Sequence, residues 1–443
     1  MSVSPDKGDR ILIEGHNLTL ATGTGIATYA RQLAATLRGL GYRTGLLAGS
    51  HQKIARKDPV LAQIGLFDAE PAPRIDRLIT AEIRRLMVGP LTAKSVLMPP
   101  LDTVVLPKNR RLSDFAEVHI IPYLLMREFQ TFRRFGRPLN VDVGNPPQLF
   151  HATRPAALRV KGCPNIYTLH DLVPMRVPYT TLDNKKLYLK IIRHICKTAD
   201  HIVTVSEFSR RDIIAFTGIP ENRITNTYQA VTLPPRLVER DRGTVASELE
   251  ALFELTAGEY FLFVGALEPK KNVSRLIDAY AASGSRRPLI IAGGDGWMND
   301  KEIRKIESER FLSYRIAGPS IRPERSVRRI PYLPFEQLVS LMQGARALLF
   351  PSIYEGFGLP VLEAMLLGTP VMTSNVTSLP EIAGEAALLA DPYDTDAMAR
   401  AIRQLDADDD LCTALSAAGK VQAESFSPAR YAQRLGTLYQ KLI

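Results

Sequence analysis

The sequence lacks the features that mark secreted, membrane-spanning or zinc-binding chains. Its 443 residues include only 3 cysteines. Cys163, Cys196 and Cys412 are far apart, odd in number and match no metal spacing, so we expect reduced thiols. No window approaches the roughly 18 uncharged apolar residues that cross a bilayer. Residues 1–15 carry charges where a signal peptide has its apolar stretch, so we expect a cytoplasmic protein.

Disorder and fibrous repeats are also excluded by composition. The chain is 45% hydrophobic and 23% charged, with 29 Gly and 31 Pro, which is ordinary for globular proteins. Its length predicts two or three domains, each with enough apolar residues for a core of its own.

Basic residues are concentrated in one segment. The net charge is +10, and residues 71–137 hold twelve Lys and Arg against six Asp and Glu. Leu, Ile, Met and Phe are interleaved with these charges, a pattern typical of amphipathic stretches that lie on anionic membranes. The pattern fits the solvated faces of surface helices equally well. No nucleic-acid-binding module accompanies the charge, so we expect no nucleic-acid partner.

Short buried-type strands alternate with amphipathic helices along the chain. Residues 10–14 form a strand, followed by a glycine turn, a helix ending near Gly41 and a strand at 44–49. The alternation restarts after a less regular polar stretch at 234–255. Further strands are expected at 148–152, 165–173, 201–206, 259–267, 288–296 and 345–352, and further helices at 206–218, 272–283 and 336–345. This order predicts an α/β protein with two Rossmann-like domains that face an interdomain cleft.

We place the domain boundary in the polar stretch. Residues 1–240 form the N-terminal domain with the basic insertion at about 71–137, and residues 241–425 form the C-terminal domain. Residues 426–443 form a helix whose apolar positions need a surface to cover, and we expect it to pack back on the N-terminal domain. Those positions are Tyr431, Leu435, Leu438 and Leu442.

The most informative segment is LLFPSIYEGFGLPVLEAMLL at 348–367. A buried strand ends at Pro351, a glycine loop follows, and a helix begins near Pro360, where proline suits the first turn. The amides of Gly358 and Leu359 are then free donors at a positive helix end, which favours an anionic phosphate. Glu355 and Glu363 lie eight positions apart across this corner and suit the hydroxyls of a ligand.

This segment resembles the retaining family-4 glycosyltransferases of the GT-B fold, whose E-x7-E signature Glu355 and Glu363 match. The resemblance extends more loosely over nearly the whole chain, including residues 368–394. It implies that Glu355 lies beside the donor sugar, that Glu363 binds the nucleotide ribose, and that the amides of Gly358 and Leu359 hold the donor diphosphate.

A second element is FVGALEPKKNV at 263–273. A lysine on the loop after a strand can neutralise a departing diphosphate. In the family, a basic pair follows the glycine that matches Gly265, and Lys271 matches the second member of the pair. The first member, usually arginine, is replaced by Ala266, and Lys270 is the candidate to compensate for it.

The N-terminal half contributes two further candidates through the resemblance. Thr24, Gly25 and Ile26 match the family's N-terminal glycine loop, and His170 matches a histidine that contacts the donor sugar. Asp171 is either the orienting partner of His170 or a cap. His151, His201 and Ser206 are interpreted as structural or secondary.

These residues predict front-face transfer with retention. No carboxylate is identifiable as a dedicated nucleophile, so the double displacement of retaining glycosidases is not required. The expected catalytic residues are His170, Lys271 and Glu355, and the expected donor-binding residues are Gly25, Gly265, Lys270, Gly356, Phe357, Gly358, Leu359 and Glu363. No D-x-D motif is convincingly placed, because Asp406 and Asp408 to Asp410 lie in an acidic turn. We therefore expect no cofactor and no metal.

The leading hypothesis is a hexosyltransferase that extends a bacterial surface polysaccharide. Its partners would be a nucleotide-sugar donor, GDP-mannose first and UDP- or dTDP-sugars as alternatives, and a glycan acceptor linked to polyprenyl diphosphate. It would work in the cytoplasm at the inner face of the cell membrane, with the basic segment on anionic lipid. A nucleotide-sugar epimerase of the same fold and a non-catalytic nucleotide-sugar or glycan-binding protein remain as alternatives.

Overall fold

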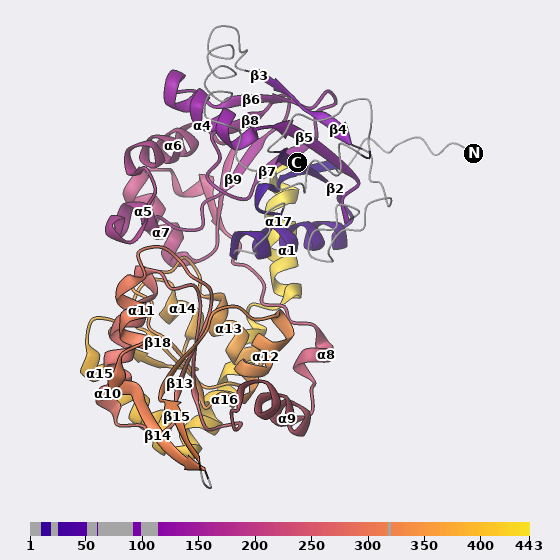
Figure 1. Cartoon of the computed structure of the whole chain (residues 1–443). Helices are drawn as coiled ribbons and strands as arrows, with labels where there is room; N and C mark the ends of the chain where they lie inside the picture. Colours follow the sequence, from indigo (N-terminus) through magenta and orange to yellow (C-terminus); the bar gives the residue numbers. More distant parts are fainter. Residues whose placement is uncertain (1–9, 19–24, 51–59, 61–91, 99–113, 318–319) are drawn as a thin grey trace.

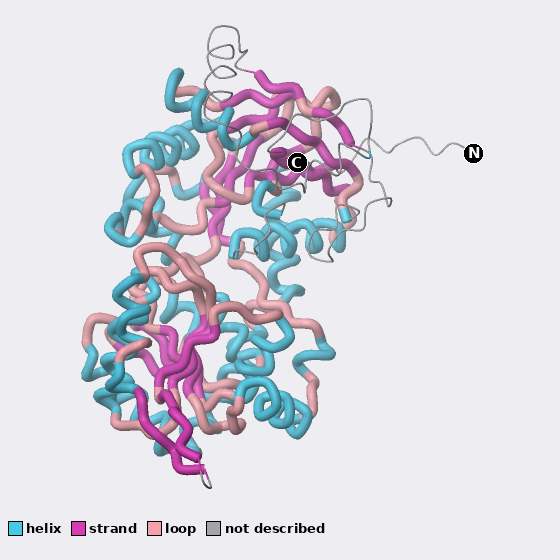
Figure 2. The backbone as a smooth tube through the Cα atoms, viewed as in Figure 1, coloured by secondary structure: helices cyan, strands magenta, loops and turns pink. Residues whose placement is uncertain are grey.

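Two parallel-stranded sheets, each flanked by helices, form the framework of the protein (Figures 1 and 2). The computed structural model describes residues 10–18, 25–50, 60, 92–98, 114–317 and 320–443. The first large sheet is built from residues before 227 and the second from residues after 260. The predicted pair of α/β domains is therefore confirmed.

The N-terminal sheet has eight strands in the order β11-β10-β9-β7-β1-β2-β5-β4. All neighbours are parallel except β4 and β5. The strands are β1 Arg10–Glu14, β2 Arg43–Ser50, β4 Val96–Met98, β5 Glu117–Pro122, β7 Leu149–Ala152, β9 Asn165–Thr168, β10 His201–Thr204 and β11 Ile224–Asn226. A small separate sheet contains β3 Thr92–Lys94, β6 Leu139–Asp142 and β8 Leu158–Val160.

Amphipathic helices cover this sheet. They are α1 Gly25–Gly39, α4 Leu124–Phe135, α5 Val173–Arg176, α6 Lys185–Thr198 and α7 Glu207–Thr217. Each buries one apolar face; in α1, for example, Tyr29, Leu33 and Leu37 are fully buried. The basic segment at 71–137 is described only at 92–98 and 114–137, so its remaining part, like Thr24, lies outside the described residues.

The C-terminal sheet is parallel, in the order β16-β13-β12-β17-β18-β19. Its strands are β12 Phe261–Val264, β13 Leu289–Ala292, β16 Val327–Ile330, β17 Ala347–Phe350, β18 Val371–Ser374 and β19 Leu388–Ala390. A hairpin of β14 Leu312–Ala317 and β15 Ser320–Arg325 projects from it. The helices are α10 Val273–Ser283, α11 Asp300–Ile306, α12 Phe335–Gly344, α13 Leu359–Leu366, α14 Leu379–Ala383, α15 Thr395–Ala407 and α16 Asp409–Glu424.

The polar stretch at 234–255 differs from its expected irregular structure. It contains α8 Pro235–Val238 and α9 Arg242–Phe253. Asp241 caps α9 by accepting a hydrogen bond from the Thr244 amide at 2.9 Å, and buried side chains recur four residues apart at Val245, Leu249 and Phe253. The amphipathic period is therefore present but masked by the surrounding charges.

The expected strand at 165–173 is also shorter than predicted. Strand β9 ends at Thr168, and α5 begins at Val173. Pro174 suits the first turn of that helix, and the Asp171 carboxylate accepts a hydrogen bond from the Val173 amide at 3.0 Å. His170 accordingly lies in the loop after β9 rather than within a strand.

The C-terminal helix α17 Pro428–Leu442 runs from the C-terminal domain to the N-terminal one, where it contacts α1 (Figure 1). Tyr431, Leu435 and Leu438 are buried. The hydroxyl of Tyr439 lies 2.5 Å from His151 Nδ1, and the opposite ring nitrogen of His151 bonds Thr168. The helix is thus fixed to the N-terminal sheet by polar as well as apolar contacts.

The two domains touch through several specific contacts near the carboxyl ends of their strands. The indole N–H of Trp297 donates to the Thr180 carbonyl at 2.7 Å, and a small apolar cluster joins Val173 and Val177 to Ile353 and Tyr354.

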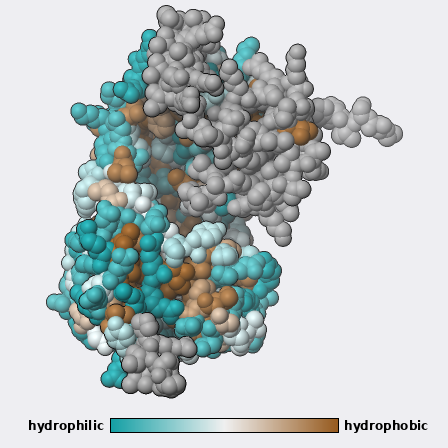
Figure 3. All heavy atoms as spheres, in the orientation of Figure 1, coloured by the Kyte–Doolittle hydropathy of each residue, from teal (hydrophilic) through white to brown (hydrophobic). Residues whose placement is uncertain are grey.

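In Figure 3 the visible face of the C-terminal domain is mostly hydrophilic, with small groups of hydrophobic atoms. Among the described helices, none is long and apolar enough to cross a membrane.

Candidate functional site

Two loops of the C-terminal sheet bring the predicted lysines and Glu355 together. Lys271 follows β12 and Glu355 follows β17, and these strands are neighbours. The ammonium nitrogen of Lys271 lies 2.5 Å from Glu355 Oε1, and that of Lys270 lies 3.9 Å from Oε2. The Ile353 amide donates to the Lys270 carbonyl at 2.8 Å, which holds the loops side by side. The result is a cluster of two lysines and one glutamate beyond the carboxyl ends of the two central strands.

The charges of this cluster keep Glu355 ionised and Lys270 protonated. Burial alone would raise the pKa of the Glu355 carboxyl, but the neighbouring Lys271 and Lys270 charges and hydrogen bonds from Lys271 and Ser352 hold that pKa below its usual value. Burial alone would lower the pKa of Lys270, but the carboxylates of Glu355, Asp171 and Glu268 raise it. Glu355 is therefore ionised and Lys270 charged at neutral pH.

The glycine corner after Glu355 is tightly supported. Ser378 Oγ is shared between the carbonyl oxygens of Glu355 and Phe357, at 2.9 and 2.8 Å. Gly358 has φ of 119°, in the left-handed region that favours glycine, and a Cβ there would lie 2.8 Å from Leu379. Leu359 begins α13, so the first amides of this helix have no carbonyl partner within it.

Phe357 itself is positioned differently from the rest of the corner. Its ring is only 4% exposed and packs edge-on against Phe426, with centroids 5.7 Å apart. Phe426 lies directly before α17, where the chain returns to the N-terminal domain. Any ligand contact from Phe357 would therefore come from its main chain.

Glu363 lies within α13, about one turn beyond the corner. It is half-buried, and burial raises the pKa of its carboxyl to about 7. A carboxyl with this pKa changes charge near neutral pH, in contrast to the permanently ionised Glu355.

Gly265 lies beside Lys271 in a backbone conformation that favours glycine. It has φ of 151°, and a Cβ there would lie 3.8 Å from Lys271 Cε. Its carbonyl is packed against Gly293, where a Cβ would lie 2.0 Å from that oxygen. Ala266 is half-buried at the position where the family has its first basic residue, so the described cations at this loop are Lys270 and Lys271.

His170 lies on the loop of the N-terminal domain that touches the glycine corner beside this cluster. Its Nε2 lies 2.9 Å from the Thr153 carbonyl, so Nε2–H is the donor there. Burial lowers the pKa of His170, and its ring packs edge-on against Tyr29 at 4.8 Å. The imidazole is therefore neutral, with its lone pair on Nδ1. A Cβ on Gly356 would lie only 2.5 Å from the His170 carbonyl oxygen, so the two walls touch here.

A buried charge network behind His170 was missed from the sequence. Arg154 bonds Glu14 at 3.1 Å and Glu128 at 2.7 and 3.0 Å. Both carboxylates are fully buried, and Arg154 is 9% exposed. Thr153 Oγ1 donates to Glu14, and the Thr153 carbonyl accepts from His170. The only sequence signal was a polar residue at the end of one buried strand, Glu14, and another directly after a second strand, Thr153.

The remaining candidates have simpler surroundings. Gly25 is exposed at the start of α1, with open space around its Cβ position. His201 bonds Thr225 at 2.8 Å within the sheet. Ser206 caps α7 and also reaches the Gly356 carbonyl of the opposite domain.

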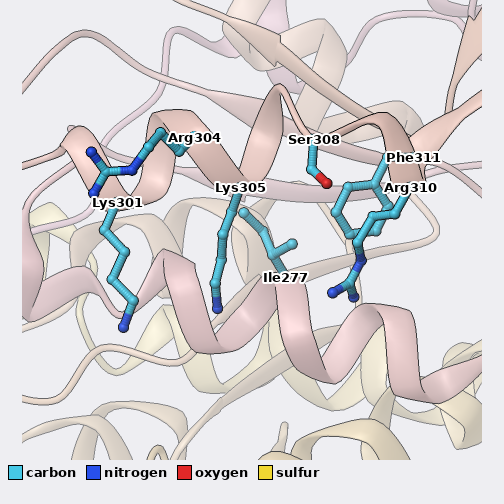
Figure 4. Close-up of a pocket in the computed structure, with 7 residues that line it drawn as sticks. All are labelled: Ile277, Lys301, Arg304, Lys305, Ser308, Arg310 and Phe311. Carbon is cyan, nitrogen blue, oxygen red and sulfur yellow. The ribbon is translucent and has the colours of Figure 1, made fainter.

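Among the described residues, no group of three or more His, Cys, Asp or Glu side chains is arranged to hold a metal ion. In the acidic turn, Asp406 and Asp409 pair with Arg287 and Arg346. A hollow of about 220 Å³ lies between α10 and α11 and is lined by Ile277, Lys301, Arg304, Lys305, Ser308, Arg310 and Phe311 (Figure 4). It shares no residue with the site above, and Lys305 is already paired with Asp278.

Comparison with known proteins matches both halves of the chain to glycosyltransferase families. Residues 100–233 match Glycosyltransferase Family 4, and residues 249–422 match Glycosyl transferases group 1. The chain is 36% identical over 267 residues to O-antigen chain mannosyltransferase B of Escherichia coli, covering 59% of this chain and 66% of that one. It is 28% identical over 270 residues to the serotype-specific mannosyltransferase WbdA of Escherichia coli, covering 59% of this chain and 32% of that one.

The matched region thus spans just under two thirds of the first relative and about one third of the second. Among solved structures, Anabaena Alr3699/HepE in complex with UDP-glucose has a TM-score of 0.64 at 14% identity and covers 98% of this chain and 100% of that one. That similarity concerns the fold. The chain therefore belongs to the glycosyltransferases, with a family-4 N-terminal domain and a group-1 C-terminal domain arranged in the GT-B fold.

Proposed function

We propose that this protein is a retaining hexosyltransferase that transfers mannose from GDP-mannose to a growing bacterial surface polysaccharide. The observation that carries the proposal is the Lys271–Glu355 pair, which lies where the two domains meet, beside the glycine corner and His170. The similarity to O-antigen mannosyltransferases supports mannose as the sugar and a polysaccharide as the acceptor.

The donor diphosphate would bind between the lysines and the amides that begin α13. A diphosphate carries negative charge that a helix N-terminus and two ammonium groups stabilise. Without a ligand, Glu355 compensates Lys271 at 2.5 Å. Donor binding would transfer part of the interaction of Lys271 to the phosphate and leave Glu355 next to the sugar.

Transfer would then proceed on one face of the sugar. The bond from C1 to the β-phosphate oxygen breaks, and its electron pair leaves with the nucleoside diphosphate. The acceptor oxygen forms the new bond to C1 from the same face, and its proton passes to the departing phosphate oxygen. Lys271 and the amides of Gly358 and Leu359 stabilise the leaving charge, and Glu355 stabilises the positive charge that develops at C1.

His170 would act as a neutral positioning group for the donor sugar. Its Nε2–H is committed to the Thr153 carbonyl, which leaves Nδ1 as a hydrogen-bond acceptor. An acceptor nitrogen on the N-terminal wall suits a sugar hydroxyl, and a neutral ring does not repel the developing oxocarbenium.

A direct test uses the purified chain with GDP-mannose, UDP-glucose, dTDP-rhamnose and a panel of mannose-terminated oligosaccharides. We expect mannosyl transfer from GDP-mannose and an α-linkage by NMR, which is retention of the donor configuration. Conversion of free donor without acceptor would indicate an epimerase. Donor binding without transfer across the panel would indicate a binding protein.

We also propose that the acceptor is lipid-linked and that α4 lies against the anionic membrane. The helix presents Arg133, Arg134, Phe129 and Phe135 to solvent, and the two aromatic rings are 40% and 50% exposed. Its opposite face is held inside by Glu128 and Phe132. An outward face of cations and aromatic rings suits the headgroup region of an anionic bilayer.

Metal independence belongs to the same proposal. In this mechanism the diphosphate charge is stabilised by Lys270, Lys271 and the amides of α13. Transfer should therefore persist in excess EDTA, and strict dependence on added Mg²⁺ or Mn²⁺ would contradict it.

A further inference from the structure

Helix α7 of the N-terminal domain contacts the residues on both sides of Glu355. In Figure 1 it lies on the side of the N-terminal domain that is next to the C-terminal domain. Its contacts are to Tyr354 and Gly356, the immediate neighbours of the carboxylate. The two residues that flank Glu355 are therefore held from the opposite domain, although the Glu355 side chain contacts only C-terminal residues among the ion pairs described.

The first grip is on the carbonyl of Gly356. Ser206 Oγ donates to this oxygen at 2.7 Å, and Ser209 Oγ donates at 3.2 Å. Both serines are fully buried. A Cβ on Gly356 would lie 3.0 Å from Asp171 Cβ, so only glycine permits this approach between the domains.

The second grip is on the side chain of Tyr354. Its hydroxyl donates to the Asp212 carboxylate at 2.6 Å, and its ring packs edge-on against Phe208. Burial, followed by the Asp212 carboxylate, raises the pKa of Tyr354, so the phenol stays protonated and remains a donor. Asp212 is fixed in turn by an ion pair with Arg176.

A third contact fixes α7 relative to the same region. The Glu381 carboxylate of α14 accepts hydrogen bonds from the Glu207 and Phe208 amides at 2.7 and 2.9 Å. These are the free amides of the first turn of α7, where a negative charge is stabilised by the helix dipole. The helix is therefore docked on the C-terminal domain by its end as well as by its side chains.

We propose that Ser206 and Tyr354 are positioning residues for Glu355, through which closure of the two domains sets the catalytic carboxylate. The segment 351–358 has no regular secondary structure, so its conformation depends on such bonds. Ser378 holds it from the C-terminal side, and α7 holds it from the N-terminal side. When the domains separate, the bonds from α7 to Gly356 and Tyr354 are lost. The segment around Glu355 then keeps its contacts within the C-terminal domain and can change conformation. This inference rests on the proposed transferase function.

The test compares Tyr354→Phe, Ser206→Asp and the control Tyr314→Phe. Tyr354→Phe removes one hydroxyl and no ring packing. Ser206 Oγ also caps α7 by accepting from the Ser209 amide at 3.0 Å, and Asp keeps this acceptor but cannot donate to Gly356. Tyr314, 68% exposed on the projecting hairpin, loses a hydroxyl far from this contact.

We expect kcat to fall about tenfold in Tyr354→Phe and at least as much in Ser206→Asp. The Kd for nucleoside diphosphate, measured calorimetrically, should change less than about twofold, because its expected contacts lie in the C-terminal domain. Thermal unfolding should show Tyr354→Phe folded at the assay temperature, with a lower midpoint than the control because one buried hydrogen bond is lost. Wild-type kcat in both variants would overturn the inference.

A second readout does not depend on transfer. Hydrogen exchange of the peptide covering 351–358 should be faster in Tyr354→Phe than in wild type or Tyr314→Phe. Unchanged exchange would overturn the inference even in an active enzyme. Absence of transfer by the wild type itself, with the exchange difference present, would instead count against the proposed function.

Discussion

The two walls of the site use charge in opposite ways. On the C-terminal wall, Lys270, Lys271 and Glu355 lie on loops, each at most 17% exposed by side chain, around a corner suited to a diphosphate. On the N-terminal wall, the charges of Glu14, Glu128 and Arg154 satisfy one another, and the residues nearest the C-terminal loops are the neutral His170 and Asp171, whose carboxylate bonds the Val173 amide.

The difference matches what each wall must do. A departing diphosphate needs positive charge placed close to it, whereas a sugar or its acceptor needs hydrogen-bonding partners in fixed positions. In the N-terminal domain the charges hold the shape of the wall, because breaking a buried pair leaves an uncompensated ion. The charges of the C-terminal cluster are therefore expected to take part in the reaction, whereas the buried charges around Arg154 stabilise the fold of the N-terminal wall.

The largest effect should be on stability, when Arg154 is removed from the buried network of the N-terminal wall. Arg154→Leu leaves two buried carboxylates without their cationic partner, and we expect the free energy of unfolding to fall by about 3–5 kcal/mol. The measurement is denaturant unfolding of the N-terminal domain followed by circular dichroism. Arg159→Leu is the matched control, since its pair with Asp200 is exposed and should contribute less than about 1 kcal/mol. Equal losses in the two variants would contradict the buried network.

Removing the charge of Lys271 or Glu355 should affect sugar transfer rather than folding. Lys271→Ala and Glu355→Gln should each lower kcat on the order of a hundredfold or more, because each group is expected to contact the reacting centre in the transition state. Radiolabelled mannose transfer measures the rate, and thermal unfolding checks the fold. Near-wild-type turnover in both variants would remove these residues from the proposed mechanism.

Glu363 tests whether the C-terminal wall also contains a titratable contact. With a pKa near 7, its carboxylate fraction rises from about one tenth at pH 6 to about nine tenths at pH 8. Since an ionised acceptor binds ribose hydroxyls more strongly, the donor KM should fall by about tenfold over this range. Glu363→Gln should flatten the profile, and an unchanged profile in that variant would assign the titration elsewhere.

The same raised pKa has a consequence for stability. The folded state holds the proton of Glu363 more tightly than the unfolded chain does, whose carboxyl titrates near 4.5. The stabilising contribution is therefore complete below about pH 4.5 and is lost as pH rises through about 7. Glu363→Gln should remove this part of the pH dependence.

The smallest expected effect concerns the outer face of the N-terminal domain. Arg133→Ala should weaken binding to vesicles containing phosphatidylglycerol by about fivefold, since one cation near an anionic surface contributes about 1 kcal/mol. Arg310→Ala, on the C-terminal domain, is the control. Equal sedimentation of wild type, Arg133→Ala and Arg310→Ala with the vesicles would contradict the proposed contact between α4 and the membrane.

The C-terminal half of the site was the more predictable half. A strand, a glycine corner and a helix with proline in its first turn are local features, and their spacing places Glu355, Gly358 and Glu363 near one another. The alternation of strands and helices likewise predicted two parallel sheets, although it did not identify β5, β16, β18 or β19. The β14–β15 hairpin was missed, because its antiparallel pairing interrupts that alternation.

The N-terminal wall could not be assembled in the same way. Arg154 meets partners 140 and 26 residues away in sequence, and the Ser206–Gly356 bond joins positions 150 residues apart. Such pairs depend on how strands are ordered in the sheet and how the two domains dock. Local periodicity contains neither piece of information, so Ser206 was interpreted as secondary although it reaches the donor corner.

Trp297 gives this architecture a native optical probe. It is the chain's single tryptophan, and its indole joins the two domains through the Thr180 carbonyl. Separation of the domains would expose the ring to water and shift its emission, with no second indole to obscure the signal. Rapid mixing of donor with the unlabelled protein would then time each opening and closing event within a catalytic cycle.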